Sequence, residues 1–426
     1  MAKANEQKTF SGILITNARI FDGKEKSLAN GMSVLTEGNK IVKIARSVTA
    51  PRGVTTVDAG GRVLMPGLID AHAHMITSNV PRLVLFASEL GYINLVAAKQ
   101  ARAALMCGFT TVRDCAGPVF DLKRAIDEGL VDGPRIYPSG AMITQTAGHG
   151  DYRNSFDLPR TGTTPLSHSE TFGATIIADG PDEVRRRARE NILLGACQIK
   201  MCMGGGVTSR DPLDVTQYSE DEIRAAVGTA EDWGTYVVAH AYTSRAIQRA
   251  VAAGVKSIEH GHLADEATVQ LMAERGAWLC IQPFLNDEDY PPKAPNNPFA
   301  MENYLRLTSG TDLCYELAKT HGVKVAWGTD VSSDRAARFL TKMVRWYTPA
   351  EVLIMATSTN AELLSLTGPR NPYPGELGVI KEGAYADLLL VNKNPLEDIS
   401  ILGEPEGAGL ALIIKDGKIY KNTLPG

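Results

Sequence analysis

Residues 63–74 read VLMPGLIDAHAH, an apolar run that ends in a His-x-His pair. Short apolar runs bounded by turn residues are typical of strands buried in a protein core. Because successive side chains on a strand alternate between its two faces, His72 and His74 are expected to point in the same direction. The run therefore predicts a buried strand that presents two imidazoles at its C-terminal end.

Seven more apolar runs follow, and amphipathic segments such as 181–196 and 219–234 lie between them. Strands that alternate with helices predict an α/β fold with a parallel sheet, and eight such units favour a (β/α)8 TIM barrel. An open, doubly wound sheet is the alternative, but no GxGxxG motif indicates a dinucleotide site. The seven runs are residues 110–114, 135–140, 198–203, 235–240, 257–260, 278–283 and 323–330.

The two ends of the chain differ from this middle part and are similar to each other. Both contain short β-type runs separated by turn signals such as Asp22-Gly23. We therefore predict one small β-sandwich domain formed by both termini, residues 1–65 plus 368–426. The barrel, residues 66–367, would be inserted between the two parts of that domain.

Composition narrows the class of protein. The chain has 426 residues, a net charge of −4 and 44% hydrophobic residues, which is ordinary globular composition without the basic face that nucleic acids or anionic membranes require. No apolar stretch is long enough to predict a membrane span. Six cysteines without a CxxC pair favour a reducing compartment, so we expect a cytoplasmic protein. A leader removed before the first residue would leave the same sequence.

Ligand-type side chains end several of the predicted strands. His240 ends the fifth, His260 the sixth and Asp330 the eighth, and catalytic groups of barrels gather at these C-terminal ends. Imidazoles and a carboxylate are suitable ligands for Zn²⁺, Mn²⁺ or Fe²⁺. Together with His72 and His74 they exceed the three protein ligands of one catalytic zinc, so two divalent metal ions explain the set better.

Several motifs together resemble the amidohydrolase superfamily. The N-terminal ITNARIFDG and the C-terminal GVIKEGAYADLLLVNKNP and IIKDGKIYKN are similar to its small β-domain. The segment TQTAGHGD, residues 144–151, resembles the ochratoxin-hydrolysing members of the prolidase-like branch. The barrel motifs occur in the order MPGLIDAHAH, GFTTVRD, IKMCMGGGV, VVAHAY, SIEHG and GTD.

The resemblance implies a role for each of six residues. His72, His74 and Asp330 would hold the more buried Zn²⁺, and His240 and His260 the outer one. Lys200, on the fourth predicted strand, would carry a CO2-derived carbamate that bridges both ions, because an unmodified Lys⁺ there would repel them. Asp330 would also be catalytic, accepting a proton from the attacking water and passing it to the departing amine.

The resemblance further implies a small-molecule amide or dipeptide with a free carboxylate as substrate, and a homo-oligomer. The bond cleaved would lead to a C-terminal amino acid, as in ochratoxin A, which releases phenylalanine. His149 and Tyr242 are implied to hold the carboxylate. Arg210 is a further candidate because guanidinium pairs bidentately with carboxylate, and His262 is a substrate-binding or supporting group.

Three alternatives remain open at this stage. The first is an Xaa-Pro dipeptidase (prolidase), and the second is a cyclic-amide hydrolase of the imidazolonepropionase type. The third is a barrel retained as a binding module without activity. Turnover of a ring substrate would favour the second, and failure to bind divalent metal would favour the third.

Overall fold

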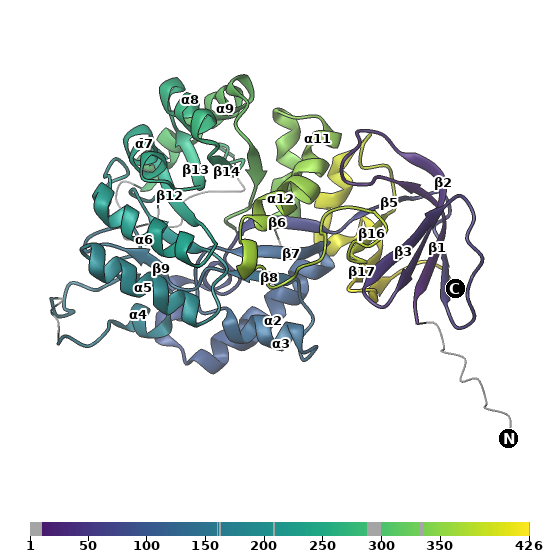
Figure 1. Ribbon diagram of the computed structural model, residues 1–426, viewed down its shortest axis with the longest axis horizontal. Helices are drawn as coiled ribbons and strands as arrows, with labels where there is room; N and C mark the ends of the chain where they lie inside the picture. The colour runs from purple at the N-terminus through teal and green to yellow at the C-terminus, as the bar shows by residue number, and fades with distance from the viewer. Residues whose placement is uncertain are drawn as a thin grey trace.

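The computed structural model describes residues 11–159, 161, 163–207, 209–287, 300–331 and 335–425. It has a β-rich part built from both ends of the chain and a larger part in which strands alternate with helices (Figure 1). The purple and yellow ends lie together on one side of the molecule, and the teal and green middle lies on the other. Strands from both ends of the chain share one sheet, as expected, while the predicted small domain and its boundaries stay a prediction.

The β-rich part is one eight-stranded sheet in the order β18-β17-β16-β5-β1-β2-β3, with β4 pairing to β1. Apolar side chains from both termini, such as Ile15, Leu64 and Leu390, are fully buried in one cluster between its strands. Burial of this apolar surface is what joins the two ends. Its strands are β1 (Ile13–Ile20), β2 (Ala29–Glu37), β3 (Lys40–Ala45), β4 (Thr55–Asp58), β5 (Val63–Pro66), β16 (Leu388–Val391), β17 (Leu410–Lys415) and β18 (Lys418–Asn422).

The α/β part contains two parallel sheets. One has the order β6-β7-β8 and the other the order β10-β9-β11-β12-β13-β14-β15. All eight predicted strand regions are occupied, and β9 and β10 are two short strands that the sequence did not predict. The strands are β6 (Leu68–Ala73), β7 (Phe109–Asp114), β8 (Arg135–Pro138), β9 (Met142–Thr144), β10 (Thr175–Ile177), β11 (Ile199–Cys202), β12 (Val237–Thr243), β13 (Ser257–Leu263), β14 (Trp278–Ile281) and β15 (Val325–Trp327).

The strand predicted at residues 63–74 is two strands in different sheets. β5 pairs with β16 in the β-rich part, whereas β6 pairs with β7. Gly67 joins them, and its amide donates to the carbonyl of Asp387. A Cβ at this position would lie 2.1 Å from the Thr110 hydroxyl oxygen, so only glycine permits the close approach at which the chain changes sheet.

The predicted α/β fold with parallel strands is confirmed, but the described strands do not form the one continuous ladder of a closed barrel. At the gap between β15 and β6, side chains replace backbone pairing. The Asn360 amide donates to the carbonyls of Ile69 and Trp327 at 2.7 and 2.8 Å and accepts from the Trp327 amide at 3.0 Å. The Asp70 carboxylate accepts from the amide and hydroxyl of Thr329. These contacts satisfy backbone groups that a ladder would otherwise pair.

The gap between β8 and β11 is bridged in a similar way. The Gln198 amide donates to the Tyr137 carbonyl at 3.0 Å and to the Ser139 hydroxyl at 2.8 Å, and the Cys197 amide donates to the Pro138 carbonyl. β9 occupies the adjoining edge of β11. The additional strand therefore displaces direct pairing between β8 and β11.

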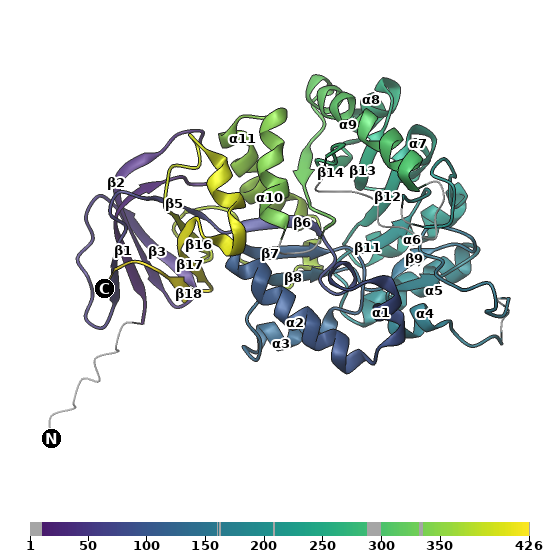
Figure 2. The ribbon, with the colours of Figure 1, turned by 180° about the vertical axis from the view of Figure 1, so that it is seen from behind.

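Helices surround the α/β sheets, as Figures 1 and 2 show from opposite sides. No helix among the described residues is both long and apolar enough to cross a membrane. The helices are α1 (Arg82–Ala87), α2 (Leu90–Met106), α3 (Phe120–Asp127), α4 (His168–Phe172), α5 (Pro181–Leu193), α6 (Glu220–Asp232), α7 (Ser244–Ala252), α8 (Glu266–Arg275), α9 (Ala300–His321), α10 (Ala336–Thr341), α11 (Pro349–Ile354) and α12 (Asn360–Ser365).

Replacing Asn360 with alanine should lower the free energy of unfolding by about 3 kcal/mol or more. The side chain is fully buried, and its loss leaves the polar groups of Trp327 and Ile69 without partners, at about 1–3 kcal/mol each. Urea unfolding followed by circular dichroism measures the change. Asn392→Ala is the control, because Asn392 is exposed and, among the described residues, its side chain donates one hydrogen bond, to Ala408. Equal stability of the two variants would contradict the role of the Asn360 amide.

Candidate metal and substrate site

The six residues predicted as metal ligands line one pocket with a volume of about 250 Å³. They come from different strands and from the segments that directly follow them, which is where parallel α/β folds place catalytic groups. The structure therefore brings the whole set together, and the role of each residue as a ligand stays a prediction. The six are His72, His74, Lys200, His240, His260 and Asp330.

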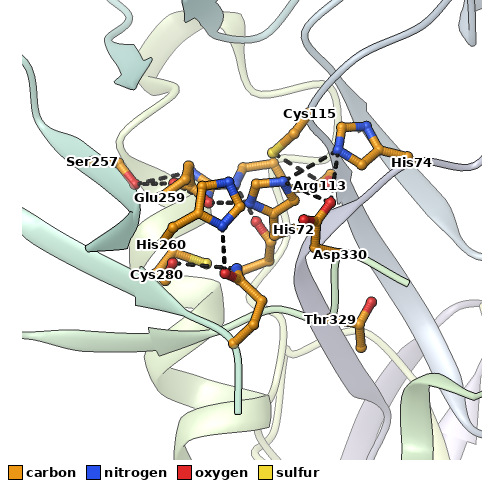
Figure 3. Close-up of polar contacts among 12 residues, drawn as sticks. His72, His74, Arg113, Cys115, Ser257, Glu259, His260, Cys280, Thr329 and Asp330 are labelled. Carbon is orange, nitrogen blue, oxygen red and sulfur yellow. Dashed lines mark hydrogen bonds and ion pairs between the residues drawn. The ribbon is translucent and has the colours of Figure 1, made fainter. Parts of the chain in front are cut away.

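Three of them converge tightly. The Nε2 atoms of His72 and His74 are 3.3 Å apart, and Asp330 Oδ1 lies 3.5 and 3.1 Å from them (Figure 3). Their ligand atoms all lie within 4.8 Å of one another, so one divalent ion fits among them. Burial lowers the pKa of His72 to about 4, which keeps this imidazole neutral and able to coordinate at neutral pH.

The other two histidines lie beside this group. The ring centroids of His240 and His260 are 4.5 Å apart, and those of His72 and His260 are 5.1 Å apart. Burial lowers the pKa of both His240 and His260 well below the usual value. The rings of His72, His240 and His260 are therefore neutral near pH 7, as metal binding requires. Burial lowers the pKa of His74, but the hydrogen bond to Asp330 outweighs this effect and raises that pKa.

Each imidazole has one ring nitrogen occupied by a protein acceptor. Nδ1 of His72 contacts Glu259, Nδ1 of His260 contacts Gln282 Oε1 at 2.7 Å, and Nδ1 of His74 faces the Ala116 carbonyl. In His240 the pattern is reversed, since Nε2 contacts the Gly205 carbonyl at 3.0 Å. The ring nitrogen that these acceptors leave for the metal is thus Nε2 in His72, His74 and His260, and Nδ1 in His240, and the Nε2 atoms of His72 and His74 already lie within 3.5 Å of Asp330 Oδ1. Such acceptors fix the tautomer of metal-binding histidines.

Lys200 has an unusual environment for a lysine. It is 1% exposed, and its Nζ has no hydrogen-bond partner among the described residues. A buried ammonium without a partner is costly, so the side chain is out of place as a simple cation. An orphaned buried amine beside four imidazoles and a carboxylate fits a group that is modified and then coordinates metal.

Two of the six residues have a strained backbone. His260 has a φ of 81° and Asp330 a φ of 54°, both in the left-handed region that few residues other than glycine adopt. Such conformations cost on the order of 1–3 kcal/mol and gather at functional sites. Both side chains line the pocket, so for these two residues the backbone conformation agrees with the choice made from residue type.

The four predicted substrate-binding residues are placed differently from one another. His149 and Tyr242 line the pocket, and the His149 ring stacks on His240 with centroids 4.2 Å apart. His262 is buried behind Phe284, on which it stacks, and does not line the described part of the pocket. Arg210 is exposed and likewise does not line it. The geometry therefore favours His149 and Tyr242 over Arg210 as groups that contact substrate.

The rest of the described pocket wall is largely apolar. Phe86 and Tyr152 pack with ring centroids 5.6 Å apart on one part of the wall, and Phe284, Leu307 and Met142 also line it. An apolar wall with a few convergent polar groups is typical of small-molecule sites. The pocket is thus suited to a substrate that has a hydrophobic body and a polar reacting centre.

The sequence interpretation missed three residues that support the site. Glu259 contacts His72, Gln282 contacts His260, and Arg113 pairs with Glu259 at 2.7 Å. Arg113 and Glu259 lie within the quoted motifs GFTTVRD and SIEHG. Charged residues inside apolar strand runs were the signal, because burial of a charge requires a partner.

The family follows from comparison with known proteins. The model of the amidohydrolase family matches residues 63–419, most of the chain. This chain belongs to the amidohydrolase family. Ochratoxinase of Aspergillus niger is 34% identical to it over 392 residues, which cover 84% of this chain and 76% of that protein.

Solved structures agree with this assignment. The amidohydrolase chain superposes on a prolidase complexed with N-methylphosphonate-L-proline with a TM-score of 0.88 and 34% identity, covering 96% of this chain and 100% of that one. The crystal structure of Aspergillus niger ochratoxinase gives a TM-score of 0.84 at 28% identity and covers 98% of each chain. The predicted resemblance is therefore confirmed, and hydrolase activity follows from the family.

Proposed function

We propose that this amidohydrolase is a binuclear metal enzyme on a (β/α)8 barrel that cleaves the amide bond to a C-terminal amino acid. The observation that carries the proposal is the buried Nζ of Lys200, which has no hydrogen-bond partner among the described residues and lies in the pocket that four predicted imidazole ligands and Asp330 also line. That donor set suits two divalent ions joined by an anionic bridge. His72, His74 and Asp330 would hold one Zn²⁺, and His240 and His260 the other.

Lys200 would provide the bridge after reaction with CO2. The neutral amine attacks the carbon of CO2, an N–C bond forms, and one C=O electron pair moves onto oxygen. Loss of one proton from nitrogen then leaves a carbamate with a single negative charge. This converts a group that would repel cations into a bidentate oxygen ligand, which explains why the site contains a lysine.

When bound, the two ions would activate water and polarise the scissile carbonyl. Asp330 would accept a proton from that water and deliver it to the departing amine. Burial by itself raises the pKa of Asp330, but the contacts that His72 and His74 make with the carboxylate outweigh this effect and hold the pKa well below its usual value. The carboxylate is therefore ionised at neutral pH and able to accept the proton.

The substrate would be an N-acyl amino acid or a dipeptide. His149 and Tyr242 would contact its free carboxylate, and the wall that includes Phe86 and Tyr152 would receive the hydrophobic acyl group. Similarity to ochratoxinase supports an aromatic amide such as ochratoxin A. Similarity to a prolidase complexed with N-methylphosphonate-L-proline supports Xaa-Pro dipeptides as the second candidate.

Zinc-loaded protein should release an amino acid from at least one of three substrate sets. These are ochratoxin A, a panel of N-acetyl amino acids, and Xaa-Pro dipeptides, with amino acid release measured by mass spectrometry. Protein stripped with a chelator is the control and should be inactive until Zn²⁺ is restored. Dihydrouracil and imidazolone propionate test the cyclic-amide alternative. Turnover of a ring substrate alone, or of nothing, would overturn the proposal.

A further inference from the structure

A buried chain of three side chains lies next to the pocket and runs from Arg113 to Glu259 to His72 (Figure 3). Arg113 Nη2 lies 2.7 Å from Glu259 Oε1, and Glu259 Oε2 lies 2.6 Å from His72 Nδ1. The three side chains are 0%, 0% and 1% exposed. A carboxylate only accepts hydrogen bonds, so His72 carries its proton on Nδ1 and presents the lone pair of Nε2 to the pocket.

The buried carboxylate of Glu259 has a hydrogen-bond partner at each oxygen, Arg113 at Oε1 and His72 at Oε2. Its Oε1 also accepts from the Ser257 hydroxyl at 2.6 Å. Arg113 is anchored in turn, donating to the Ala71 carbonyl and the Tyr236 hydroxyl.

This ion pair has no part in the proposed amide hydrolysis, and neither member lines the described part of the pocket. Cys280 lies close enough to form a possible ligand group with His72 and Glu259. Burial raises the pKa of the Cys280 thiol well above its usual value, however, so the thiol stays neutral and is a poor ligand. Because Glu259 is already paired with Arg113, the cluster supports the neighbouring site instead of holding an ion itself.

The other half of the pocket is supported by neutral acceptors. His260 contacts the amide oxygen of Gln282, and His240 contacts the backbone carbonyl of Gly205. A negative charge behind an imidazole raises its basicity toward a metal more than a neutral acceptor does. The acceptor that contacts His72 is therefore negatively charged, whereas the acceptors that contact His240 and His260 are neutral.

We propose that Glu259, paired with Arg113, is a positioning residue that fixes the tautomer of His72 and makes the His72–His74–Asp330 site the tighter of two metal sites. The inference rests on the proposed two-metal function. It assigns the order of loading, with the first divalent ion entering beside His72 and the second beside His240 and His260.

Calorimetric titration of the metal-free protein with Zn²⁺, in the presence of a competing chelator, tests the assignment. In Glu259→Gln the tighter binding step should weaken about 10- to 100-fold, which is typical when such a supporting contact is lost, and the weaker step should change little. Gln282→Ala is the matched control and should weaken only the weaker step. A tighter step of unchanged affinity in folded Glu259→Gln would overturn the inference.

Two further measurements keep the test decisive if Glu259→Gln folds poorly with Arg113 unpaired. The double variant Arg113→Met/Glu259→Gln removes both charges together, and it should fold and bind the first ion more weakly. In metal-free wild-type protein, ¹⁵N NMR should find His72 as the Nδ1–H tautomer, and the Nε2–H tautomer would overturn the inference without any variant. If wild-type protein binds no divalent ion, the proposed function itself fails, which is a different result.

Discussion

Lys200→Ala should abolish turnover, with a fall in kcat/KM of about 10³-fold or more, or about 4 kcal/mol of transition-state stabilisation. The variant loses the only group proposed to bridge the two ions, so four imidazoles and Asp330 are left without a shared anionic ligand. Without the bridge, bound metal no longer activates water effectively. Amino acid release and metal content per chain, measured by mass spectrometry, give the two readouts.

The fold should survive this change, because Lys200 Nζ has no hydrogen-bond partner among the described residues. Thermal unfolding of metal-free wild type and metal-free variant should therefore be similar. Lys256→Ala is the matched control, since Lys256 is exposed and precedes β13 at the end opposite the pocket. Carbon-13 NMR after exposure to labelled bicarbonate should show a carbamate signal in wild type and none in Lys200→Ala. Full activity in Lys200→Ala would contradict the proposed bridge.

Asp330→Asn should lower kcat by about 10²- to 10⁴-fold, the range expected when a general acid–base group is lost. The asparagine is nearly the same size but does not accept the proton from water. Because Asp330 Oδ1 also lies 3.1 Å from His74 Nε2, the variant should bind the ion of that site more weakly as well. Assays at saturating Zn²⁺ separate the two effects, since a deficit in kcat that persists there reports the lost proton transfer.

The control for Asp330→Asn is the same chemical change at Asp214, which is exposed in the loop after β11. Asp214→Asn should keep wild-type kcat and metal content. Recovery of full kcat by Asp330→Asn at high Zn²⁺ would show that the carboxylate acts only as a ligand. In that case the proton acceptor must be sought elsewhere in the pocket.

The sequence predicted the elements of this fold more successfully than their pairing. Each apolar run became a strand because its side chains need burial, a local property of composition and period. Residues 63–74 show the limit of that reasoning. The run reads as one predicted strand, yet the chain passes from one sheet to the other at Gly67, and the contact with Thr110 that excludes a side chain there exists only in three dimensions.

For the candidate site too, the sequence showed suitable residue types but not which of them reach the pocket. His72 and His74 were identified from their spacing, and Lys200 from its place in an apolar run and the family resemblance. Arg210 looked equally suitable in sequence but is exposed outside the described part of the pocket. Residue type shows what a side chain is able to bind, whereas its neighbours in space determine whether it reaches the substrate.

The sequence alone thus determined the strand–helix alternation, the joining of the two termini, the family and the identity of the six candidate ligands. The first two depend on residue type and short-range periodicity, and the last two also on motifs that resemble a known family, all of which are present in the chain before it folds. Only the tertiary structure decided which ring nitrogen of each histidine faces the pocket and that Glu259 lies behind His72. It also decided that hydrogen bonds of the Asn360 side chain take the place of backbone pairing between β15 and β6. Such hydrogen bonds join residues far apart in the sequence, so no local pattern specifies them.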